Sequence, residues 1–377
     1  MQITEKTAAH HEHVELARLY SSVKMMGPPL NEKLITIIAH LFTREEARLC
    51  RHLSFIYPKT AGHIARKSGL PADKITRMLD SLSQKRIILS PGNRYMLYPL
   101  IPGSFEHLLR IGGYSGWNNK YAELINDLFN TGYMGEYFGR PINALRNIPV
   151  QKAVENNSVV ADSDLVSELI DSHRNFSVYN VCPCRKSMRL TGHACKRADP
   201  GDGCLTFGDY SLSIAEHGDG RSVSKEEMRG IVEERWGKKL VFLTSNVIPT
   251  VPTAICTCCD CCCHALGIHN KFSKNLLAPP HLIAAVDESR CVGCGRCVTV
   301  CNTYAHTVDN ARHGYDHRNC IGCGNCVMVC GNKAITMIEN RSYRPPVRSY
   351  QRLILKMLPP VILTGTKIKL MRFLKMG

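Results

Sequence analysis

The chain has 377 residues and a mass of 42.1 kDa, which predicts roughly two to four domains, because single cores stop growing at about 250–300 residues. Its apolar fraction of 44% and charged fraction of 21% exclude an intrinsically disordered chain. The chain has no run of about 18 apolar residues, and its first residues lack the apolar core of a signal peptide. Neither a transmembrane helix nor a signal peptide is therefore predicted.

The net charge of +16 is concentrated at the two ends of the chain. Residues 1–110 contain 16 Lys and Arg against 9 Asp and Glu, and residues 341–377 contain 9 basic residues and no acidic ones. Residues 111–340 contain 23 of each kind. Each basic end therefore needs its own explanation.

Cysteine is the unusual component, with 19 residues. An odd, clustered set does not resemble the disulfide framework of a secreted domain. We therefore expect metal-bound thiols in a reducing cytoplasm.

Residues 1–110 show the helix pattern of a small DNA-binding module. Thr43 with Glu46 forms a predicted capping box, and a short helix ends at Gly69. The next helix is predicted from an apolar stripe at helical spacing, namely Ile75, Met78, Leu79 and Leu82. Ser-Pro-Gly-Asn at 90–93 then joins two β-rich runs into a hairpin. This order resembles the MarR- and ArsR-like winged-helix families in pattern.

The resemblance implies that the helix with the Ile75–Leu82 apolar stripe is the one that reads DNA. Lys74, Thr76, Arg77 and Lys85 would then face outward in the major groove, with Arg94 on the wing near the phosphate backbone. The alternative is a protein-docking domain, because small winged modules are often used in that way.

Two regions without a clear fold signature follow. Residues 111–180 are predicted to be a helical linker region, whose glycine-rich stretches mark turns. Residues 181–280 form a cysteine-rich, metal-binding region.

Residues 281–340 contain the same cysteine motif twice. CVGCGRCVTVC (291–301) and CIGCGNCVMVC (320–330) both have the spacing C-x2-C-x2-C-x3-C. Three cysteines on a glycine-containing loop can wrap one face of an iron–sulfur cubane, and the fourth is carried towards a second cluster. Short β-prone runs at 282–286, 306–308 and 334–338 predict a βαββαβ unit.

Residues 282–340 resemble the bacterial two-[4Fe–4S] ferredoxin family. The resemblance implies two ligand sets: Cys291, Cys294, Cys297 and Cys330 for the first cluster, and Cys320, Cys323, Cys326 and Cys301 for the second. The family usually has proline after each fourth cysteine, whereas this chain has Asn302 and Gly331. Paired zinc sites, which also use C-x2-C, are the alternative.

Four further cysteines lie in a loop rich in Gly, Pro and Asp: Cys182, Cys184, Cys195 and Cys204. Five Lys and Arg residues between 185 and 197 would stabilise a negatively charged cluster of four thiolates. A zinc site or cysteines scattered in a core are the alternatives.

The stretch CTCCDCCC (256–263) adds six thiols: Cys256, Cys258, Cys259, Cys261, Cys262 and Cys263. A helix capped by Ser224 and a following strand can fold this stretch back beside Cys182–Cys204, which gathers ten thiols, enough for two four-thiolate sites with two to spare. Neighbouring residues of an extended chain point to opposite sides, so six sulfurs cannot all face one cubane. One or two further [4Fe–4S] clusters are expected, with a larger assembly or a metallothionein-like metal sink as alternatives.

The tail, residues 341–377, mixes basic and apolar residues and is predicted to be broken at Pro359–Pro360. Its last part can form a basic amphipathic helix on an anionic membrane surface. Docking on an acidic partner or packing back over the clusters are the alternatives.

These observations predict a multi-domain α+β protein. The leading hypothesis is a cytoplasmic, multi-cluster 4Fe–4S protein that transfers electrons to or from a redox protein partner, as a component of an anaerobic oxidoreductase system. A complete enzyme is less favoured, because the chain shows neither a dinucleotide fingerprint nor a phosphate loop. The alternative is an iron–sulfur redox sensor that regulates transcription by binding DNA through the winged helix.

Overall fold

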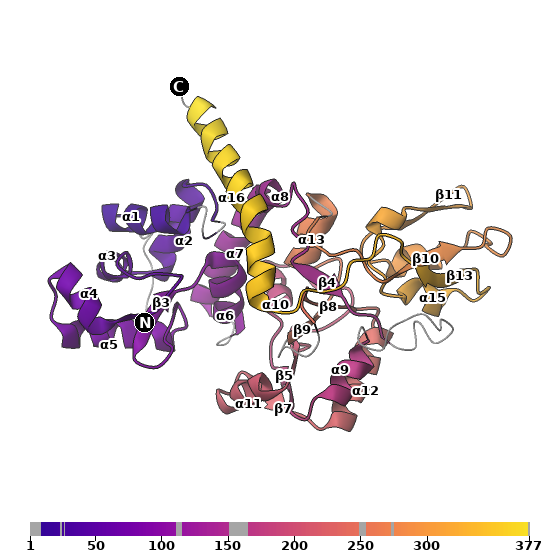
Figure 1. The fold of residues 1–377 in the computed structure, drawn as a ribbon, viewed down its shortest axis with the longest axis horizontal. Coiled ribbons are helices and arrows are strands. Elements are labelled where there is room, and N and C mark those ends of the chain that lie inside the picture. Colours follow the sequence, from indigo (N-terminus) through magenta and orange to yellow (C-terminus); the bar gives the residue numbers. More distant parts are fainter. Residues whose placement is uncertain are drawn as a thin grey trace. The chain divides into compact units, whose positions relative to one another are not determined.

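The computed structural model describes residues 9–22, 25, 27–110, 115–150, 165–248, 254–272 and 275–375. The chain divides into two compact units. The first unit comprises 1–134, 186–193 and 365–377, and the second unit comprises 135–185 and 194–364. Helices and several small antiparallel sheets occur together, so the fold class is α+β, as predicted (Figure 1).

The first unit is built mainly from helices. Its helical elements are α1 (His11–Tyr20), α2 (Glu32–Leu41), α3 (Arg44–Cys50), α4 (Ala61–Ser68), α5 (Ala72–Gln84), a short π-helical turn η2 (Leu100–Ser104), α6 (Phe105–Arg110) and α7 (Gly116–Asn130). Three short strands, β1 (Lys59–Thr60), β2 (Ile88–Leu89) and β3 (Arg94–Leu97), form a sheet in the order β1-β3-β2.

The capping residues, the helix-ending glycine and the hairpin of this unit occur where the sequence predicts them. The Thr43 hydroxyl accepts from the Glu46 N–H and the Glu46 carboxylate accepts from the Thr43 N–H, so the predicted capping box starts α3. Helix α4 ends at Gly69, whose φ of +72° requires a residue without a Cβ cost. Strands β2 and β3 pair as the predicted hairpin. The assignment of these elements to a winged-helix domain stays a prediction.

The second unit is organised around a six-stranded antiparallel sheet in the order β4-β8-β9-β6-β5-β7. The strands are β4 (Leu145–Asn147), β5 (Phe176–Tyr179), β6 (Leu205–Phe207), β7 (Gly220–Ser222), β8 (Val241–Ser245) and β9 (Ala254–Cys258). Strands β4 and β5 lie where a helical linker was predicted from the sequence. Runs of three and four residues are too short to show a two-residue period.

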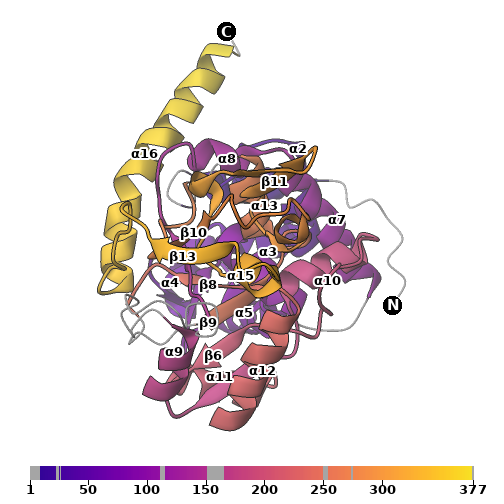
Figure 2. The same ribbon diagram turned by 90° about the vertical axis from the view of Figure 1, so that its right-hand side faces the viewer.

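Helices lie between the strands of this sheet in the chain. Those described between residues 133 and 271 are α8 (Tyr133–Tyr137), α9 (Val166–Ser172), α10 (Pro183–Leu190), α11 (Asp209–Glu216), α12 (Lys225–Gly237) and α13 (His264–Lys271), and most of α10 belongs to the first unit. Helices α9 and α12 lie side by side and share an apolar core with the sheet (Figures 1 and 2). Met228 and Val232 of α12 are buried in that core.

The central strand β9 presents different chemistry on its two faces. Ile255 packs into the apolar core beside Phe242. Cys256 and Cys258, the residues directly before and after Thr257, contact other clusters of buried residues instead. Alternation along the strand therefore places these two thiols on the face opposite the apolar core.

The ferredoxin-like segment has the element order expected of a βαββαβ unit. Its elements are β10 (Leu282–Val286), α14 (Arg296–Val300), β11 (His306–Asp309), β12 (Arg312–Tyr315), the 3-10 turn η5 (His317–Asn319), α15 (Asn325–Val329) and β13 (Ile335–Glu339). Strand β10 pairs with β13, and β11 pairs with β12, both antiparallel. All three predicted β-prone runs lie in these strands.

The tail forms one helix, α16 (Tyr350–Lys375), which continues through Pro359 and Pro360. The predicted break at these prolines is therefore wrong. Each proline removes one helical hydrogen bond, and the turns on either side preserve the helical course. No helix in the described ranges is both long and apolar enough to cross a membrane.

Candidate metal centres

The first ferredoxin loop and the last cysteine of the second loop line one cavity. Cys291, Cys294 and Cys297 lie on its wall together with Cys330. Burial, with the nearby Cys291 and Cys294, raises the pKa of the Cys297 thiol. The cavity thus collects the four sulfurs that the resemblance implies for the first cluster.

The second loop gathers the complementary set. Burial raises the pKa of the Cys323 thiol to about 12, and Cys301 and Cys320 contribute to this rise. Burial also raises the pKa of Cys326, and Cys323, Cys320 and Cys301 add to the effect. Since buried thiols resist ionisation, a bound metal would have to supply the positive charge that turns them into thiolates.

Two loop glycines explain how the backbone fits around these cysteines. A Cβ on Gly293 would lie 2.0 Å from the carbonyl oxygen of Ala311, and one on Gly322 would lie 2.4 Å from that of Leu282. Both glycines also have positive φ, +65° and +71°. The close approach that the cysteine loops need therefore excludes any side chain at these positions.

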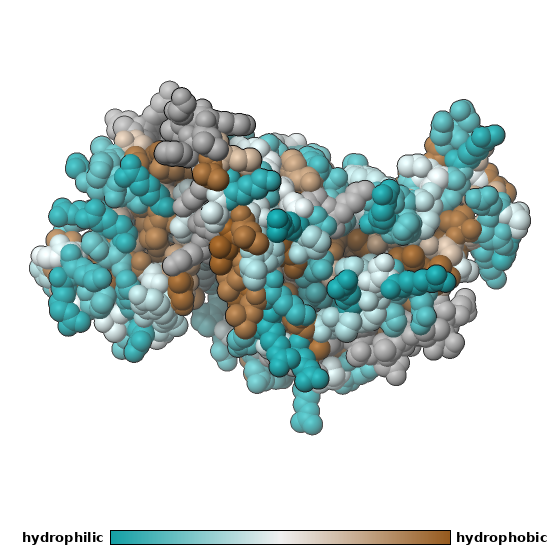
Figure 3. Space-filling view, turned by 45° about the horizontal axis from the view of Figure 1, so that its top comes forward, coloured by the Kyte–Doolittle hydropathy of each residue, from teal (hydrophilic) through white to brown (hydrophobic). Residues whose placement is uncertain are grey.

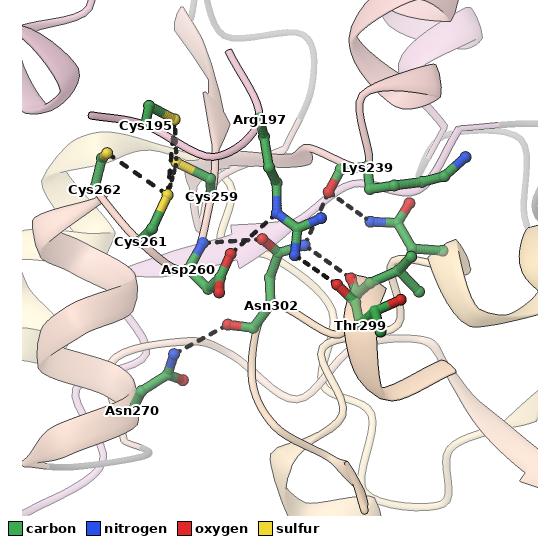
Figure 4. A network of polar contacts seen from close by, with 12 residues as sticks. Cys195, Arg197, Lys239, Cys259, Asp260, Cys261, Cys262, Asn270, Thr299 and Asn302 are labelled. Carbon is green, nitrogen blue, oxygen red and sulfur yellow. Dashed lines mark hydrogen bonds and ion pairs between the residues drawn. The ribbon is translucent and has the colours of Figure 1, made fainter. Parts of the chain in front are cut away.

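The middle of the chain brings its ten cysteines into two groups, and the loop that follows β9 serves both. The four-thiol group consists of Cys195, Cys259, Cys261 and Cys262 (Figure 4). Its sulfur atoms all lie within 4.8 Å of one another. The six-thiol group consists of the remaining middle cysteines, Cys182, Cys184, Cys204, Cys256, Cys258 and Cys263.

The six-thiol group is a more extended row. The sulfurs of Cys204 and Cys256 are 3.3 Å apart. Cys258 hydrogen-bonds with Cys256 and Cys263, which raises the pKa of Cys258. A hydrogen bond with Cys263 likewise raises the pKa of Cys184. A row of six sulfurs of this kind suits a polynuclear cluster rather than one metal ion.

Two buried arginines accompany the six-thiol group. Arg185 is 2% exposed and donates to the carbonyl oxygens of Asp202 and Thr257. Arg235 is 3% exposed and donates to the carbonyl oxygen of Gly203. The Nε atoms of both arginines are buried without a hydrogen-bond partner. A buried guanidinium needs a negative neighbour, and a thiolate-bound cluster provides one.

Asn302 joins the end of the first ferredoxin loop to the middle cysteines. It directly follows Cys301, and its side-chain oxygen accepts the backbone N–H of Asp260 at 2.9 Å (Figure 4). Its side-chain nitrogen donates to the carbonyl oxygen of Lys239 at 2.9 Å. Where the ferredoxin family usually has proline, this chain thus has a buried amide that contacts the CTCCDCCC stretch.

A second contact ties the same two segments. Arg197 forms an ion pair with Asp260, with 3.0 Å between Nε and Oδ1, and donates to the carbonyl oxygen of Thr299 at 3.0 Å (Figure 4). Both charged side chains of this pair are largely buried. The loop that carries three thiols of the four-thiol group is therefore fixed to helix α14.

The sequence analysis missed a histidine pair beside the first ferredoxin loop. His306 and His313 lie 3.0 Å apart between Nδ1 and Nε2, and both lie close to the sulfur of Cys297. His306 lies on β11 and His313 lies on β12, but the two residues are not direct partners across the hairpin. No regular spacing in the sequence therefore predicts this contact.

Three of the residues predicted to contact DNA lie on α5 in the first unit, whereas Lys85 directly follows α5 and Arg94 begins β3. Lys74 pairs with Glu45 at 2.5 Å and Arg77 pairs with Asp73 at 3.0 Å. The Thr76 hydroxyl donates to the carbonyl oxygen of Ala72. Exposed ion pairs of this kind are weak, so the two cations can exchange their carboxylate partners for phosphate.

Comparison with known proteins assigns one segment. Residues 284–340 match the family model described as a 4Fe-4S dicluster domain. The chain matches no curated protein and no solved structure. The ferredoxin resemblance is thereby confirmed for this segment, which makes the chain an iron–sulfur protein with an electron-transfer domain. The winged-helix resemblance and the individual ligand assignments stay predictions.

Proposed function

We propose that this protein is an electron-transferring component of an anaerobic oxidoreductase system, with a third iron–sulfur cluster held by the six-thiol group. Bound [4Fe–4S] clusters supply one-electron transfer. The residues of the chain determine where such clusters are held and how they are connected.

The packing of Cys323 carries this proposal. Cys323 belongs to the second ferredoxin set and packs against the apolar cluster that contains Cys258 and Cys263 of the six-thiol group. The second ferredoxin set is thus continuous with the six-thiol group through packed atoms. The contact between Asn302 and Asp260 fixes the neighbouring loop, because Asn302 follows Cys301 and Asp260 lies between Cys259 and Cys261 of the four-thiol group.

The first ferredoxin set has the features of a surface-exposed site for electron exchange. Cys294 is exposed, and Val292 beside it is 66% exposed. Arg290, which precedes the loop, and Arg296, which lies within it, are also exposed. We propose that a redox protein partner docks here, because an exposed cluster with an apolar and basic rim favours contact with an acidic partner.

Metal analysis of anaerobically purified full-length protein tests this function. We expect more than eight iron atoms per chain with a matching amount of acid-labile sulfide, because two cubanes account for about eight. Low-temperature EPR of the reduced protein should show more species than a two-cluster ferredoxin. An iron content of eight, with the six-thiol group reactive towards a thiol reagent in the folded protein, would refute the extended relay.

A redox-sensing regulator is the second candidate, favoured by the pairing of a helix-rich N-terminal unit with a hairpin and exposed cations on α5. A mobility-shift assay with the DNA upstream of its own coding region, in the oxidised and reduced states, separates the two. Redox-dependent, salt-sensitive binding that Lys74→Ala and Arg77→Ala abolish would support regulation. Equal weak binding to any DNA would leave electron transfer as the function.

Two further features belong to this proposal. The tail is proposed to dock on an anionic surface, either a membrane or an acidic partner. A cytoplasmic location is proposed from the thiol content, since exposed and clustered thiols are kept reduced there.

A further inference from the structure

We propose that the four-thiol group is a mononuclear zinc site, separate from the iron–sulfur clusters and built from Cys195, Cys259, Cys261 and Cys262. The spacing of the four sulfur atoms distinguishes a site for one metal ion from a site for a cubane. The proposal does not depend on the proposed electron route.

Four sulfur–sulfur distances define the group. Cys195 lies 3.6 Å from Cys259 and 3.7 Å from Cys261, and Cys261 lies 3.7 Å from Cys259 and 3.6 Å from Cys262. The remaining pairs also lie within 4.8 Å. A tetrahedral ion with metal–sulfur bonds of about 2.3 Å needs sulfur–sulfur edges of about 3.8 Å. The four sulfurs therefore already stand near the corners of such a tetrahedron.

A cubane needs a wider arrangement. Each of its cysteines binds a different iron atom and points outward from the cluster, so the sulfurs lie farther apart than around one ion. The ferredoxin loops of the same chain serve as an internal comparison. Within the described ranges, no three sulfurs of these loops lie within 4.8 Å of one another. The four-thiol group is too tight to surround a cubane in the same way.

The surroundings of the group match a metal–thiolate site. The backbone N–H groups of Arg197 and Lys196 hydrogen-bond the sulfurs of Cys195 and Cys261, respectively. The buried Arg197–Asp260 ion pair brings a guanidinium close to thiolates that would carry a net negative charge around a divalent ion. Four sulfur ligands in tetrahedral geometry are typical of structural zinc, which needs no open coordination position.

The site would explain why CTCCDCCC has more thiols than one cluster needs. Cys259 is 1% exposed and Cys262 is 3% exposed, so the ion would lie inside the protein. It would join the loop after α10 to the turn between β9 and α13. In this way it would hold the six-thiol side of the same turn in place.

Zinc K-edge X-ray absorption of the full-length protein, purified anaerobically, tests the proposal without any substitution. We expect about one zinc per chain with four sulfur neighbours at about 2.3 Å. Zinc with nitrogen or oxygen neighbours would be adventitious and would overturn the proposal. The absence of zinc from protein grown with ample zinc would overturn it as well.

A pair of variants separates the two middle groups. Cys261→Ser should lower zinc by about tenfold and leave the iron and sulfide contents unchanged, because ligand loss weakens a four-thiolate site strongly. Cys258→Ser should lower iron and leave zinc in place. Loss of about four iron atoms with their sulfide in Cys261→Ser would overturn the proposal and indicate a cubane. Loss of one iron atom without sulfide would overturn the zinc assignment.

Cys50→Ala provides the matched control. Cys50 is buried in the first unit and belongs to neither group, so both zinc and iron should stay at their wild-type levels. The zinc and iron contents are separate measurements. An iron content of only eight would refute the proposed relay while zinc with four sulfur ligands would still establish this site.

Discussion

At the scale of single residues, the side chains that most distinguish this protein from a small ferredoxin are buried polar ones. Asn302 is 1% exposed and connects Asp260, Lys239 and Asn270 by hydrogen bonds. Asn270 donates to the backbone carbonyl oxygen of Asn302, whereas the contacts with Asp260 and Lys239 need a side-chain amide that proline, the usual residue of the ferredoxin family, does not provide. The substitution of one residue type thus creates a junction between two parts of the second unit.

Asn302→Ala should destabilise this junction by about 1–3 kcal/mol, because it leaves the backbone N–H of Asp260 without its acceptor, whereas the carbonyl oxygen of Lys239 keeps a hydrogen bond from Asn325. The guanidinium concentration at which the anaerobic protein loses its visible cluster absorption should fall accordingly. Asn332→Ala is the matched control, since Asn332 is exposed and donates only a long bond of 3.4 Å to Arg290. Equal midpoints for the two variants would contradict the role given to Asn302.

Arg235→Met should make the six-thiol cluster harder to reduce. Removing a unit charge within about 6 Å, at an effective dielectric constant of about 20, changes the energy by about 3 kcal/mol, or roughly 100 mV. EPR-monitored redox titration measures the shift, which should be towards more negative potential. Arg229→Met on the same helix is the control, because Arg229 is exposed and pairs with Asp171. An unchanged potential in Arg235→Met would show that no anionic cluster lies beside this guanidinium.

At the scale of elements, α16 has the composition of a docking helix. Ile354, Leu355, Leu358 and Leu363 are between 40% and 65% exposed. Apolar atoms also reach the surface between hydrophilic ones on the face drawn in Figure 3. Because residues 341–377 contain no acidic residue, apolar and electrostatic attraction can act together on an anionic surface.

Leu355→Ser combined with Leu358→Ser should weaken association with vesicles that contain anionic lipid by about thirtyfold, because each exposed leucine would lose about 1 kcal/mol of transfer free energy. Co-sedimentation with such vesicles measures the effect, and vesicles of neutral lipid are the control. A wild-type protein that does not sediment with either kind of vesicle would exclude a membrane and leave an acidic protein partner.

At the scale of the whole molecule, the three proposed iron–sulfur sites differ in their exposure. The first ferredoxin set includes the exposed Cys294, whereas the six-thiol group includes the buried Cys204, Cys258 and Cys263. Solvent access should therefore decrease from the first set towards the middle of the chain. This gradient suits a protein that exchanges electrons with a partner at the first ferredoxin set and shields the six-thiol group from solvent.

A chelator should therefore remove iron in a defined order. We expect about four iron atoms to leave first, from the first ferredoxin set, during incubation with an iron chelator under anaerobic conditions. EPR of samples taken over time identifies which cluster signal disappears. Simultaneous loss of all signals would contradict the gradient and indicate global unfolding as the route of release.

Some of this structure could be read from local sequence. The repeated C-x2-C-x2-C-x3-C motif, the flanking strands, the capping box at Thr43 and the N-cap at Ser224 depend on neighbouring residues, so the sequence alone predicts them. The gathering of ten middle thiols was also predictable, since a helix followed by a strand returns the chain to its starting edge. The strand β4 was missed because its three residues belong to the sheet through pairing with β8, a contact 96 positions or more away in the chain.

The sequence by itself determined that the chain has two ferredoxin loops and more thiols than two clusters use. Only the tertiary structure decided how the six thiols of CTCCDCCC are divided. Pleating places Cys256 and Cys258 with Cys204, and the turn after β9 brings Cys259, Cys261 and Cys262 to Cys195. Neighbours in sequence are separated by strand geometry, while partners more than 60 positions apart are joined by sheet pairing, and no local pattern contains that information.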